Sequence, residues 1–295
     1  MLDSMQPKSV THSNASPTLD VLFQRILARQ PDAVALIDPL DKQRITGQPP
    51  KRLTFAQANR AISALAAHFI ESGLPANSVI ALQLPNTIEF ALTALAAHRA
   101  GLVVAALPLL WRQAELTVAL NRTGARAVVT TSRIDGVSHA DIAMHAAAEC
   151  FSIRHVCGFG DDLPEGMASL DRAIALESQT TRAVIQDGRK AALVSFDMTS
   201  DGFRAVPRTH LSVIAGGLAL SLESDVPQGA TIMSAYTPCS FAGIASSLAM
   251  WLLTGGTPAL HHPFDGETRE GQGNEASRDT LGGPARLDFR LRRAD

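Results

Sequence analysis

The chain has 295 residues, of which 46% are hydrophobic and 18% are charged, and its formal net charge is −2. This is the composition of a globular protein, and the length predicts one large domain or two small ones around a buried core. The near-neutral charge disfavours a nucleic-acid or polyanion binder, because such proteins normally carry an excess of basic residues.

Cysteine usage and hydropathy predict a cytoplasmic protein. The three cysteines have neither metal-ligand spacing nor the density of a disulfide framework, which is typical of a reducing compartment. Residues 1–20 lack the apolar core of a secretory signal. No apolar run reaches the roughly 18–20 residues that a membrane span requires, and the longest candidate, residues 241–253, contains two serines and is better explained as a buried helix.

The first half of the chain alternates short apolar runs with segments of helical periodicity. We predict a flexible leader at residues 1–18 and a folded domain over residues 19–265, with subregions at about 19–180 and 190–265. Thr54 and Gln57 have the spacing of a capping box. Strands are expected at 33–37, 78–84, 102–107 and 125–130, helices between Thr54 and Gly73, between an Asn86 cap and Gly101 and at 113–121, and a loop at 38–51. This alternation predicts parallel β-α-β units.

The second half is less regular before residue 190 and regular again after it. A helix is expected at 138–149 and a strand at 154–157, followed by a polar loop to residue 190. After it we predict a strand at 191–196, a loop rich in hydroxyl and acidic side chains, and a helix at 208–223. The prediction ends with strands at 231–235 and 258–261 on either side of a helix at 241–253.

The last thirty residues, 266–295, differ in character from the rest of the chain. They are rich in Asp, Glu, Arg and Gly and show no strand or helix period, apart from a short basic stretch at 287–293. Such a segment cannot bury enough apolar surface to offset the entropy lost on ordering. It is either a regulatory tail or a non-native ending, and we predict a disordered or frameshifted tail.

Five ordered motifs between residues 53 and 129 resemble those of a known family. They are Leu53-Thr-Phe, Gln83-Leu-Pro-Asn86, Glu89-Phe90, His98-Arg-Ala-Gly101 and Gly124-Ala-Arg-Ala-Val-Val129, and Gly255-Gly-Thr257 with Phe264-Asp265 follows later. Their order and spacing resemble the amino-terminal domain of AMP-dependent synthetases and ligases of the acyl-CoA synthetase type. The resemblance covers roughly residues 30–265.

This resemblance implies a fold, an activity and a set of co-substrates. The fold would be the α/β amino-terminal domain of adenylate-forming ligases, with β-α-β units and mixed or parallel sheets flanked by helices, present here in incomplete form. The activity would be that of an acid–CoA ligase in fatty-acid metabolism, which converts ATP and a small carboxylic acid to an acyl-adenylate and then to acyl-CoA. ATP, Mg²⁺ and CoA would be required, and neither a nucleic-acid partner nor a protein-bound metal is expected.

The resemblance also places a phosphate-binding loop between residues 196 and 206, anchored on Thr209-His210. Thr199 and Ser200 retain the two central hydroxyls, and Arg204 stands where the family carries lysine. Gly202 is a further candidate phosphate-binding residue. Hydroxyls and backbone N–H groups in such a loop bind ATP phosphates. Three substitutions alter the loop: an acid replaces a small hydroxyl residue at Asp197, and Met198 and Asp201 replace glycines.

Three further residues are implied to line an acyl or nucleotide pocket: His210, Phe241 and Gly243. Phe241 occupies a position where the family often carries histidine. The other histidines match no metal-ligand spacing and are predicted to be core or surface residues. They include His139, His145, His155 and the pair His261-His262.

The adenine-binding, ribose-binding and carboxyl-terminal segments of the family have no counterpart in this sequence, so no catalytic residue is assigned. A truncated ligase with an altered phosphate loop and weak or no activity is therefore the first hypothesis. An inactive fragment that binds an acyl ligand or a protein is the second, and a poorly folding pseudogene product is the third. Neither a G-x-G-x-x-G nor a G-x-S-x-G motif is present to favour a dehydrogenase or a serine hydrolase.

Overall fold

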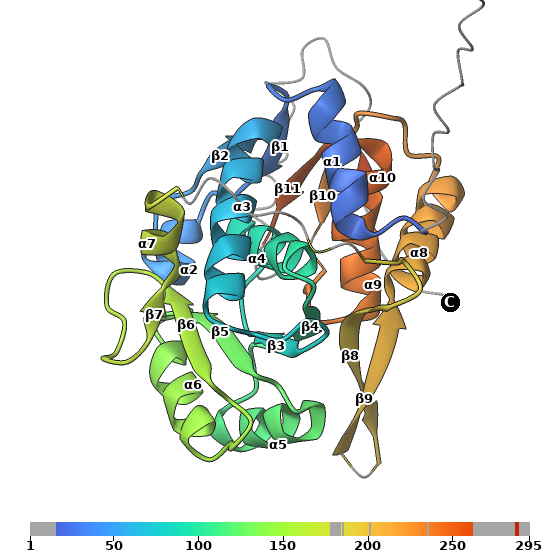
Figure 1. The fold of residues 1–295 in the computed structure, drawn as a ribbon. Coiled ribbons are helices and arrows are strands. Elements are labelled where there is room, and N and C mark those ends of the chain that lie inside the picture. The colour runs from blue at the N-terminus through green and yellow to red at the C-terminus, as the bar shows by residue number, and fades with distance from the viewer. Residues whose placement is uncertain are drawn as a thin grey trace, which may run out of the picture.

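The computed structural model describes residues 16–177, 184, 186–200, 202–234, 236–261 and 287–288, and these form two β-sheets with flanking helices (Figure 1). Most strands are parallel to their neighbours, and β8–β9 and β1–β2 are antiparallel. The seven-stranded sheet consists, in spatial order, of β7 (Ala168–Ser169), β6 (His155–Phe159), β5 (Ala127–Thr131), β3 (Val79–Leu82), β4 (Val103–Ala106), β8 (Ala191–Thr199) and β9 (Gly202–Thr209). The five-stranded sheet consists of β12 (Leu287–Asp288), β10 (Thr231–Ser234), β11 (Thr257–Leu260), β1 (Val34–Ile37) and β2 (Arg52–Thr54). The α/β prediction is confirmed.

Helices cover both faces of the seven-stranded sheet. The crossover helices between its parallel strands are α4 (Ile88–Arg99), α5 (Gln113–Thr123) and α6 (His139–Ala148), and α3 (Phe55–Glu71) connects β2 of the smaller sheet to β3. Ile80 and Leu82 of β3 belong to the core cluster that contains residues of α3 and α4, whereas Ala81 belongs to the cluster that contains residues of α5 and α6 (Figure 1). Because successive strand residues point to opposite faces, both faces are buried, which explains the continuous apolar runs in the sequence.

The five-stranded sheet brings together segments that are far apart in the sequence. β1 pairs in parallel with β11 and antiparallel with β2, so residues 34–54 complete a sheet that otherwise contains residues from beyond position 230 (Figure 1). Thr257 Oγ1 reinforces this pairing by donating to the carbonyl of Val34 at 2.7 Å.

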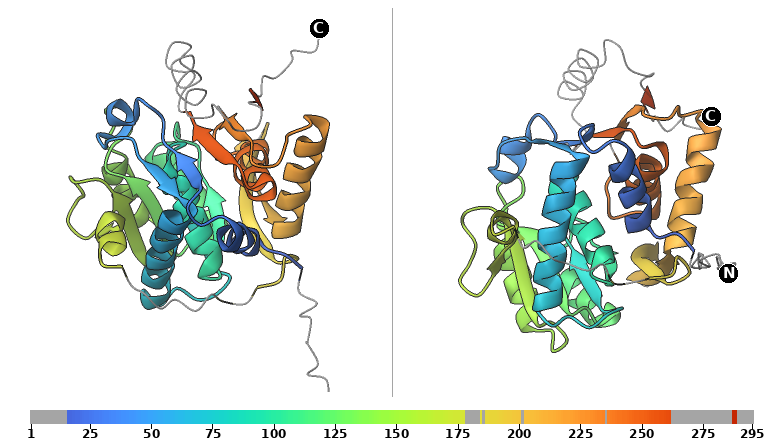
Figure 2. Two further views of the ribbon diagram at one scale, coloured as in Figure 1. Left: turned by 90° about the horizontal axis from the view of Figure 1, so that it is seen from above. Right: turned by 45° about the horizontal axis from the view of Figure 1, so that its top comes forward.

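The remaining helices surround this sheet and the outer edge of the larger one (Figure 2). They are α1 (Leu19–Arg29), α2 (Lys42–Thr46), α7 (Leu170–Ala175), α8 (His210–Glu223), α9 (Phe241–Ile244), a π-helical segment (Ala245–Ala249) and α10 (Met250–Thr254). The last three are consecutive, so the region predicted as a single helix at residues 241–253 consists of two α-helical segments with a π-helical segment between them. No helix in the described part of the chain is long and apolar enough to cross a membrane.

Three aromatic side chains join α1, α3 and α10 in the core. Phe23, Phe55 and Trp251 are each at most 1% exposed, and their ring centroids are 5.9–6.0 Å apart. Aromatic pairs at such separations add to the free energy of burial. This cluster fixes the amino-terminal helix α1 against the helical segment that follows β10.

The capping box is confirmed, because the Thr54 side chain accepts from Gln57 N and the Gln57 side chain accepts from Thr54 N. The cap predicted at Asn86 is wrong: Thr87 is the N-cap of α4, and the Asn86 amide donates instead to the carbonyl of His261 at 2.9 Å. The helices α2 and α7 lie where loops were expected. Most of the predicted leader and tail lie outside the described residues.

We expect Phe23→Ala to lower the free energy of unfolding by about 3–5 kcal/mol, because it opens a cavity inside the aromatic cluster. Urea denaturation measures this change. Phe151→Ala is the matched control, since that ring is 97% exposed, and it should change the free energy by less than about 0.5 kcal/mol. Equal effects of the two substitutions would contradict the assigned core.

Candidate functional site

The segment predicted to be a phosphate loop is a β-hairpin. β8 continues past the expected end at residue 196 to Thr199, and β9 returns from Gly202, so that Thr199 is paired with Gly202 at the tip. The expectation of an unpaired loop is therefore wrong, and the following helix begins at His210 rather than at residue 208. Gly202 has a φ of +111°, a conformation that favours glycine and that closes the turn.

The four predicted phosphate-binding residues lie together at the tip of this hairpin. Thr199, Ser200, Gly202 and Arg204 are all exposed, and Thr199 Oγ1 donates to the Gly202 carbonyl at 3.2 Å. Asp197 is opposite Arg204 in the ladder. The tip thus presents two hydroxyl groups and a guanidinium group to solvent.

An aromatic cluster anchors the hairpin to the sheet. The Trp111 and Phe203 rings stack with centroids 4.5 Å apart, and Phe196 packs edge-on against both of them. Arg122 on α5 lies 4.8 Å from the centroid of the Phe203 ring and donates to the Phe203 carbonyl. The middle of the hairpin is therefore fixed while its tip projects into solvent.

The three predicted pocket residues lie around α8 and the start of α9. His210 is fully buried at the first residue of α8. Phe241 packs against Gly216 of α8, and Arg208 lies 4.9 Å from the centroid of its ring. Gly243 cannot carry a side chain here, because a Cβ atom would lie 2.0 Å from the Thr237 carbonyl oxygen. A role of these residues in ligand binding stays a prediction.

An open hollow of about 390 Å³ lies beyond the carboxyl ends of strands from both sheets. Segments that follow β3, β4 and β5 of the larger sheet and β10 and β11 of the smaller sheet line it. Ligands of open α/β sheets bind characteristically at this end of the strands. Its apolar wall consists of Leu109, Leu110, Ile134, Val137 and Tyr236, and its polar side chains are Asn86, Arg112, Asp135, Thr237, His139 and His261.

Gln83 orients His139, one of the two buried histidines that line this hollow. The Gln83 amide nitrogen donates to the carbonyls of Pro108 and Trp111 at 3.0 and 2.9 Å, so its oxygen is free to accept from His139 Nδ1 at 3.2 Å. Burial and the nearby Arg112 charge lower the pKa of His139 to about 4. His139 is therefore neutral near pH 7, with its proton on Nδ1.

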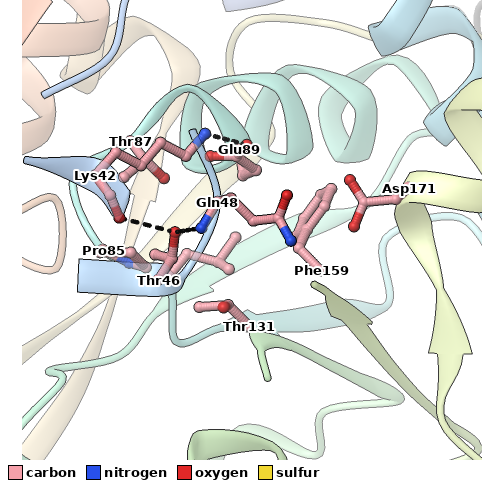
Figure 3. A pocket seen from close by; sticks show the side chains of 10 residues that line it. Lys42, Thr46, Gln48, Pro85, Thr87, Glu89, Thr131, Phe159 and Asp171 are labelled. Carbon is pink, nitrogen blue, oxygen red and sulfur yellow. Dashed lines mark hydrogen bonds and ion pairs between the residues drawn. The ribbon is translucent and has the colours of Figure 1, made fainter. Parts of the chain in front are cut away.

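A second, smaller pocket of about 10 Å³ contains a buried ion cluster (Figure 3). Lys42 on α2, only 1% exposed, lies between Asp38 Oδ2 at 2.7 Å and Glu89 Oε1 at 2.5 Å. Gln48 and Asp171 also line the pocket. Its volume suits about one water molecule, so this cluster stabilises the fold and offers no space for a substrate.

The protonation of this cluster follows from burial and charge. Burial and the Glu89 charge raise the pKa of Asp38 to about 6, against the opposing effect of Lys42. Burial alone would also raise the pKa of Glu89, but the Lys42 ammonium group lowers it below its usual value. Burial would lower the pKa of Lys42, and its two carboxylate partners raise it. Lys42 therefore stays charged and is compensated within the protein.

Sequence patterns did not identify Asp38, Lys42 or Gln83 as members of these clusters. Lys42 lies in a segment expected to be a loop, and its two partners are on β1's carboxyl end and on α4. The only local signal was the four-residue spacing of Asp38 and Lys42. His139, which was expected to be a core or surface residue, is buried. Among the described residues, no group of three or more His, Cys, Asp or Glu side chains could hold a metal ion.

Comparisons with known proteins agree on one family and one fold. The sequence profile of the family described as AMP-binding enzyme matches residues 23–272. Over 195 residues, the chain is 25% identical to the medium-chain fatty-acid–CoA ligase of Escherichia coli K12 and 28% identical to a salicyl-AMP ligase of Mycobacterium tuberculosis. Each match covers 65% of this chain and 33% of the relative, so the chain spans about a third of these relatives.

Solved structures show the same fold at low sequence identity. An acyl-CoA synthetase from Brucella canis superposes with a TM-score of 0.73 at 20% identity, covering 92% of this chain and 47% of that one. The amino-terminal domain of FACL13 from Mycobacterium tuberculosis gives 0.73 at 16% identity, covering 86% of this chain and 60% of that one.

We expect Lys42→Met to lower the free energy of unfolding by about 3–5 kcal/mol, because it leaves two buried carboxylates without their cation. Chemical denaturation at pH 7.5 measures the loss. Arg44→Met is the matched control: Arg44 also pairs with two carboxylates, but its side chain is 55% exposed, and the loss there should be at most about 1 kcal/mol. A loss no greater at Lys42 than at Arg44 would contradict a structural role of the cluster.

Proposed function

We propose, from the premise that this chain belongs to the AMP-binding enzyme family, that it forms part of an ATP-dependent acid–CoA ligase. In this reaction a carboxylate oxygen attacks the α-phosphorus of ATP, pyrophosphate leaves, and an acyl-adenylate forms. The thiol of CoA then takes the acyl group and AMP leaves. Because the chain spans about a third of its curated relatives, we propose that it supplies the phosphate end of the ATP site and has weak activity, or none, by itself.

The tip of the β8–β9 hairpin is the observation that carries this proposal. Thr199 and Ser200 offer hydroxyl donors, Arg204 offers a guanidinium group, and all three are exposed on one two-stranded element. Gly202 leaves the backbone open at the turn. Phosphate chains are bound by such donors together with backbone N–H groups. The anchored aromatic rings below the tip hold these donors at one edge of the sheet.

Asp197 is the residue of the hairpin that fits a Mg²⁺ ion carried by the nucleotide. Its side chain is 46% exposed, and Arg208 lies 3.9 Å away. A lone carboxylate would repel the phosphates, whereas Mg²⁺ prefers carboxylate and phosphate oxygens and would offset that repulsion. Bound Mg²⁺–ATP would supply the activated phosphorus, and the residues of the chain would bind and orient its phosphate tail.

The hollow beyond the strand ends is proposed to accommodate the acceptor, CoA. CoA combines a flexible chain with anionic phosphates, and the hollow combines an apolar wall with the exposed cation of Arg112. A volume of about 390 Å³ holds part of such a molecule while the remainder stays in solvent. Arg112 is the side chain best suited to pair with a phosphate group.

A second candidate function is binding of an acyl ligand without turnover. It is favoured by Met198, which is 74% exposed on the hairpin where the resemblance implies a glycine, and by the acid at position 197. This alternative predicts that acyl ligands bind equally well with and without ATP. Titration with aliphatic and aromatic acids, with and without Mg²⁺–ATP, separates the two functions, because only a ligase site couples acid binding to the nucleotide; any ATP–pyrophosphate exchange would further support the ligase.

We expect Arg204→Ala to weaken ATP binding about tenfold, which is the usual effect of losing one charge-assisted hydrogen bond. Calorimetric titration with Mg²⁺–ATP measures it. Arg189→Ala is the control, because that side chain is 73% exposed and lies before the strand rather than at the tip. If the wild-type protein, Arg204→Ala and Arg189→Ala all bind ATP with equal affinity, the hairpin is not the phosphate site.

Arg112→Ala should weaken CoA binding about tenfold and leave ATP binding unchanged, because it removes the cation of the hollow but not of the hairpin. Arg126→Ala, which alters an exposed residue at the amino end of β5, serves as the control. Titration of each variant with CoA gives the comparison. Loss of ATP and CoA affinity together would indicate a general disturbance of the fold and would refute separate sites.

A further inference from the structure

Two buried histidines meet where α1, α4, β8 and α8 converge. His98, on the last turn of α4, is 5% exposed, and His210, the first residue of α8, is fully buried. Their ring centroids are 4.8 Å apart and the rings are inclined by 71°. His210 directly follows β9, so the pair lies at the base of the β8–β9 hairpin.

The outer contacts of the two rings fix their tautomers. His210 Nδ1 lies 3.4 Å from the backbone N–H of Leu19 and must accept, so its proton is on Nε2. His98 Nε2 lies 3.0 Å from the carbonyl of Ala192 and must donate. Burial lowers the pKa of His98 to about 4, so near pH 7 its ring is neutral and its Nδ1 carries a lone pair. Each ring is therefore neutral, and each has one inner nitrogen left over.

The two inner nitrogens are complementary. His98 Nδ1 and His210 Nε2 are buried, and neither atom has a hydrogen-bond partner in the structure. One is an acceptor and the other is a donor, in rings that already touch. Leaving both unsatisfied would cost roughly 1–3 kcal/mol for each group, and a hydrogen bond between them would remove this cost. This cost gives a physical reason for the two rings to bond to each other.

The backbone around the pair connects the same elements. His210 N donates to the Lys190 carbonyl at 3.2 Å, Leu211 N to the Gly188 carbonyl at 2.9 Å, and Gly188 N to the Ser16 carbonyl at 3.0 Å. The segment before α1 thus contacts the segment before β8, which contacts the start of α8. The contact between His98 and His210 adds α4 to this group of connected segments.

The charged groups near the pair are already compensated or exposed. Asp20 on α1 and Arg99 on α4 pair with each other at 2.8 Å. Before β8, Asp187 lies 3.8 Å from Arg189, and the Lys190 side chain is exposed. On β9, Arg208 lies near Asp197. The Asp20 charge favours the charged form of His98, but burial outweighs it and lowers the pKa of His98.

We propose that His210 Nε2–H donates to His98 Nδ1, so that a relay of hydrogen bonds runs from Leu19 through both rings to Ala192 and holds the base of the hairpin. The pair acts as positioning residues for the phosphate site, and in that respect the inference rests on the proposed function. Uptake of one proton by either ring places a donor against a donor and breaks the relay. The hairpin and α8 then separate from α1 and α4 in acid.

Proton linkage gives the direction and the range of this effect. Burial lowers the pKa of His98 to about 4, and burial together with the His98 charge lowers that of His210 to about 2. The unfolded chain binds protons at both positions below about pH 6.5, whereas the folded chain does not. The stabilising effect is therefore complete above pH 6.5. The contribution of His98 is lost as the pH falls from 6.5 to about 4, and that of His210 as it falls from 6.5 to about 2.

Nitrogen-detected NMR of histidine-labelled protein tests the relay directly. We expect two neutral rings with protons on Nε2 at pH 7, and a scalar coupling across the hydrogen bond between His210 Nε2 and His98 Nδ1. Any other tautomer, or two neutral rings without this coupling, would overturn the proposal. The measurement needs no nucleotide, so failure of the proposed ligase function leaves it interpretable.

Hydrogen exchange and unfolding test the consequence. His98→Gln keeps a donor for the Ala192 carbonyl, and His210→Asn keeps an acceptor for Leu19 N–H, but neither residue titrates. When the pH is lowered from 6 to 5, the unfolding equilibrium constant should increase about tenfold less in each variant than in the wild-type protein. Each substitution should also remove the acid-induced hydrogen exchange of the Leu19 and Leu211 amides. His145→Gln, at an exposed position, should change neither. If the unfolding equilibrium constants of His98→Gln and His210→Asn both depend on pH as in the wild-type protein, the proposed histidine relay is refuted.

Discussion

The carboxylate of Asp38 is the contact on which the arrangement of the two sheets depends. It follows β1 of the smaller sheet, and its Oδ1 accepts from Ile88 N, at the start of a helix packed on the larger sheet, at 2.9 Å. It therefore replaces the side-chain cap that Thr87 does not provide. Its Oδ2 accepts from Lys42 Nζ at 2.7 Å and Lys51 N at 3.0 Å. A single buried group thus satisfies three donors from three segments, which makes its position difficult to shift.

The candidate phosphate site combines a fixed base with an exposed tip. Stacked Trp111 and Phe203 hold the middle of the hairpin, and His98 and His210 lie at its base. Supporting groups of this kind reduce the freedom that a ligand would otherwise have to remove on binding. The two hydroxyl groups and the guanidinium group of the tip make few contacts within the protein, so they remain available to an anion. The altered residue Asp197 changes the charge of the hairpin and is not one of the aromatic side chains that support it.

Local signals predicted the parts of the fold that short-range contacts determine. The Thr54 capping box and the buried parallel strands follow from sequence spacing, and the structure contains them. The hairpin was missed because its strands mix exposed polar residues with Phe196 and Phe203, whose partner Trp111 is more than eighty residues away. The ion cluster was missed for the same reason, since Asp38 caps a helix fifty positions further on. Family resemblance identified the overall fold because it includes such distant contacts implicitly.

The pairing of β1 with β11 determines when the chain can finish folding during its synthesis. The Thr257–Val34 hydrogen bond joins residues 223 positions apart, and at about 5–20 residues per second the ribosome needs roughly 11–45 s to cover that distance. Throughout this interval one edge of β1 has no strand beside it and can pair with another chain. Until its partner strand emerges, β1 can pack against α3, which it contacts in the folded protein. Long-range topology of this kind also slows refolding in vitro.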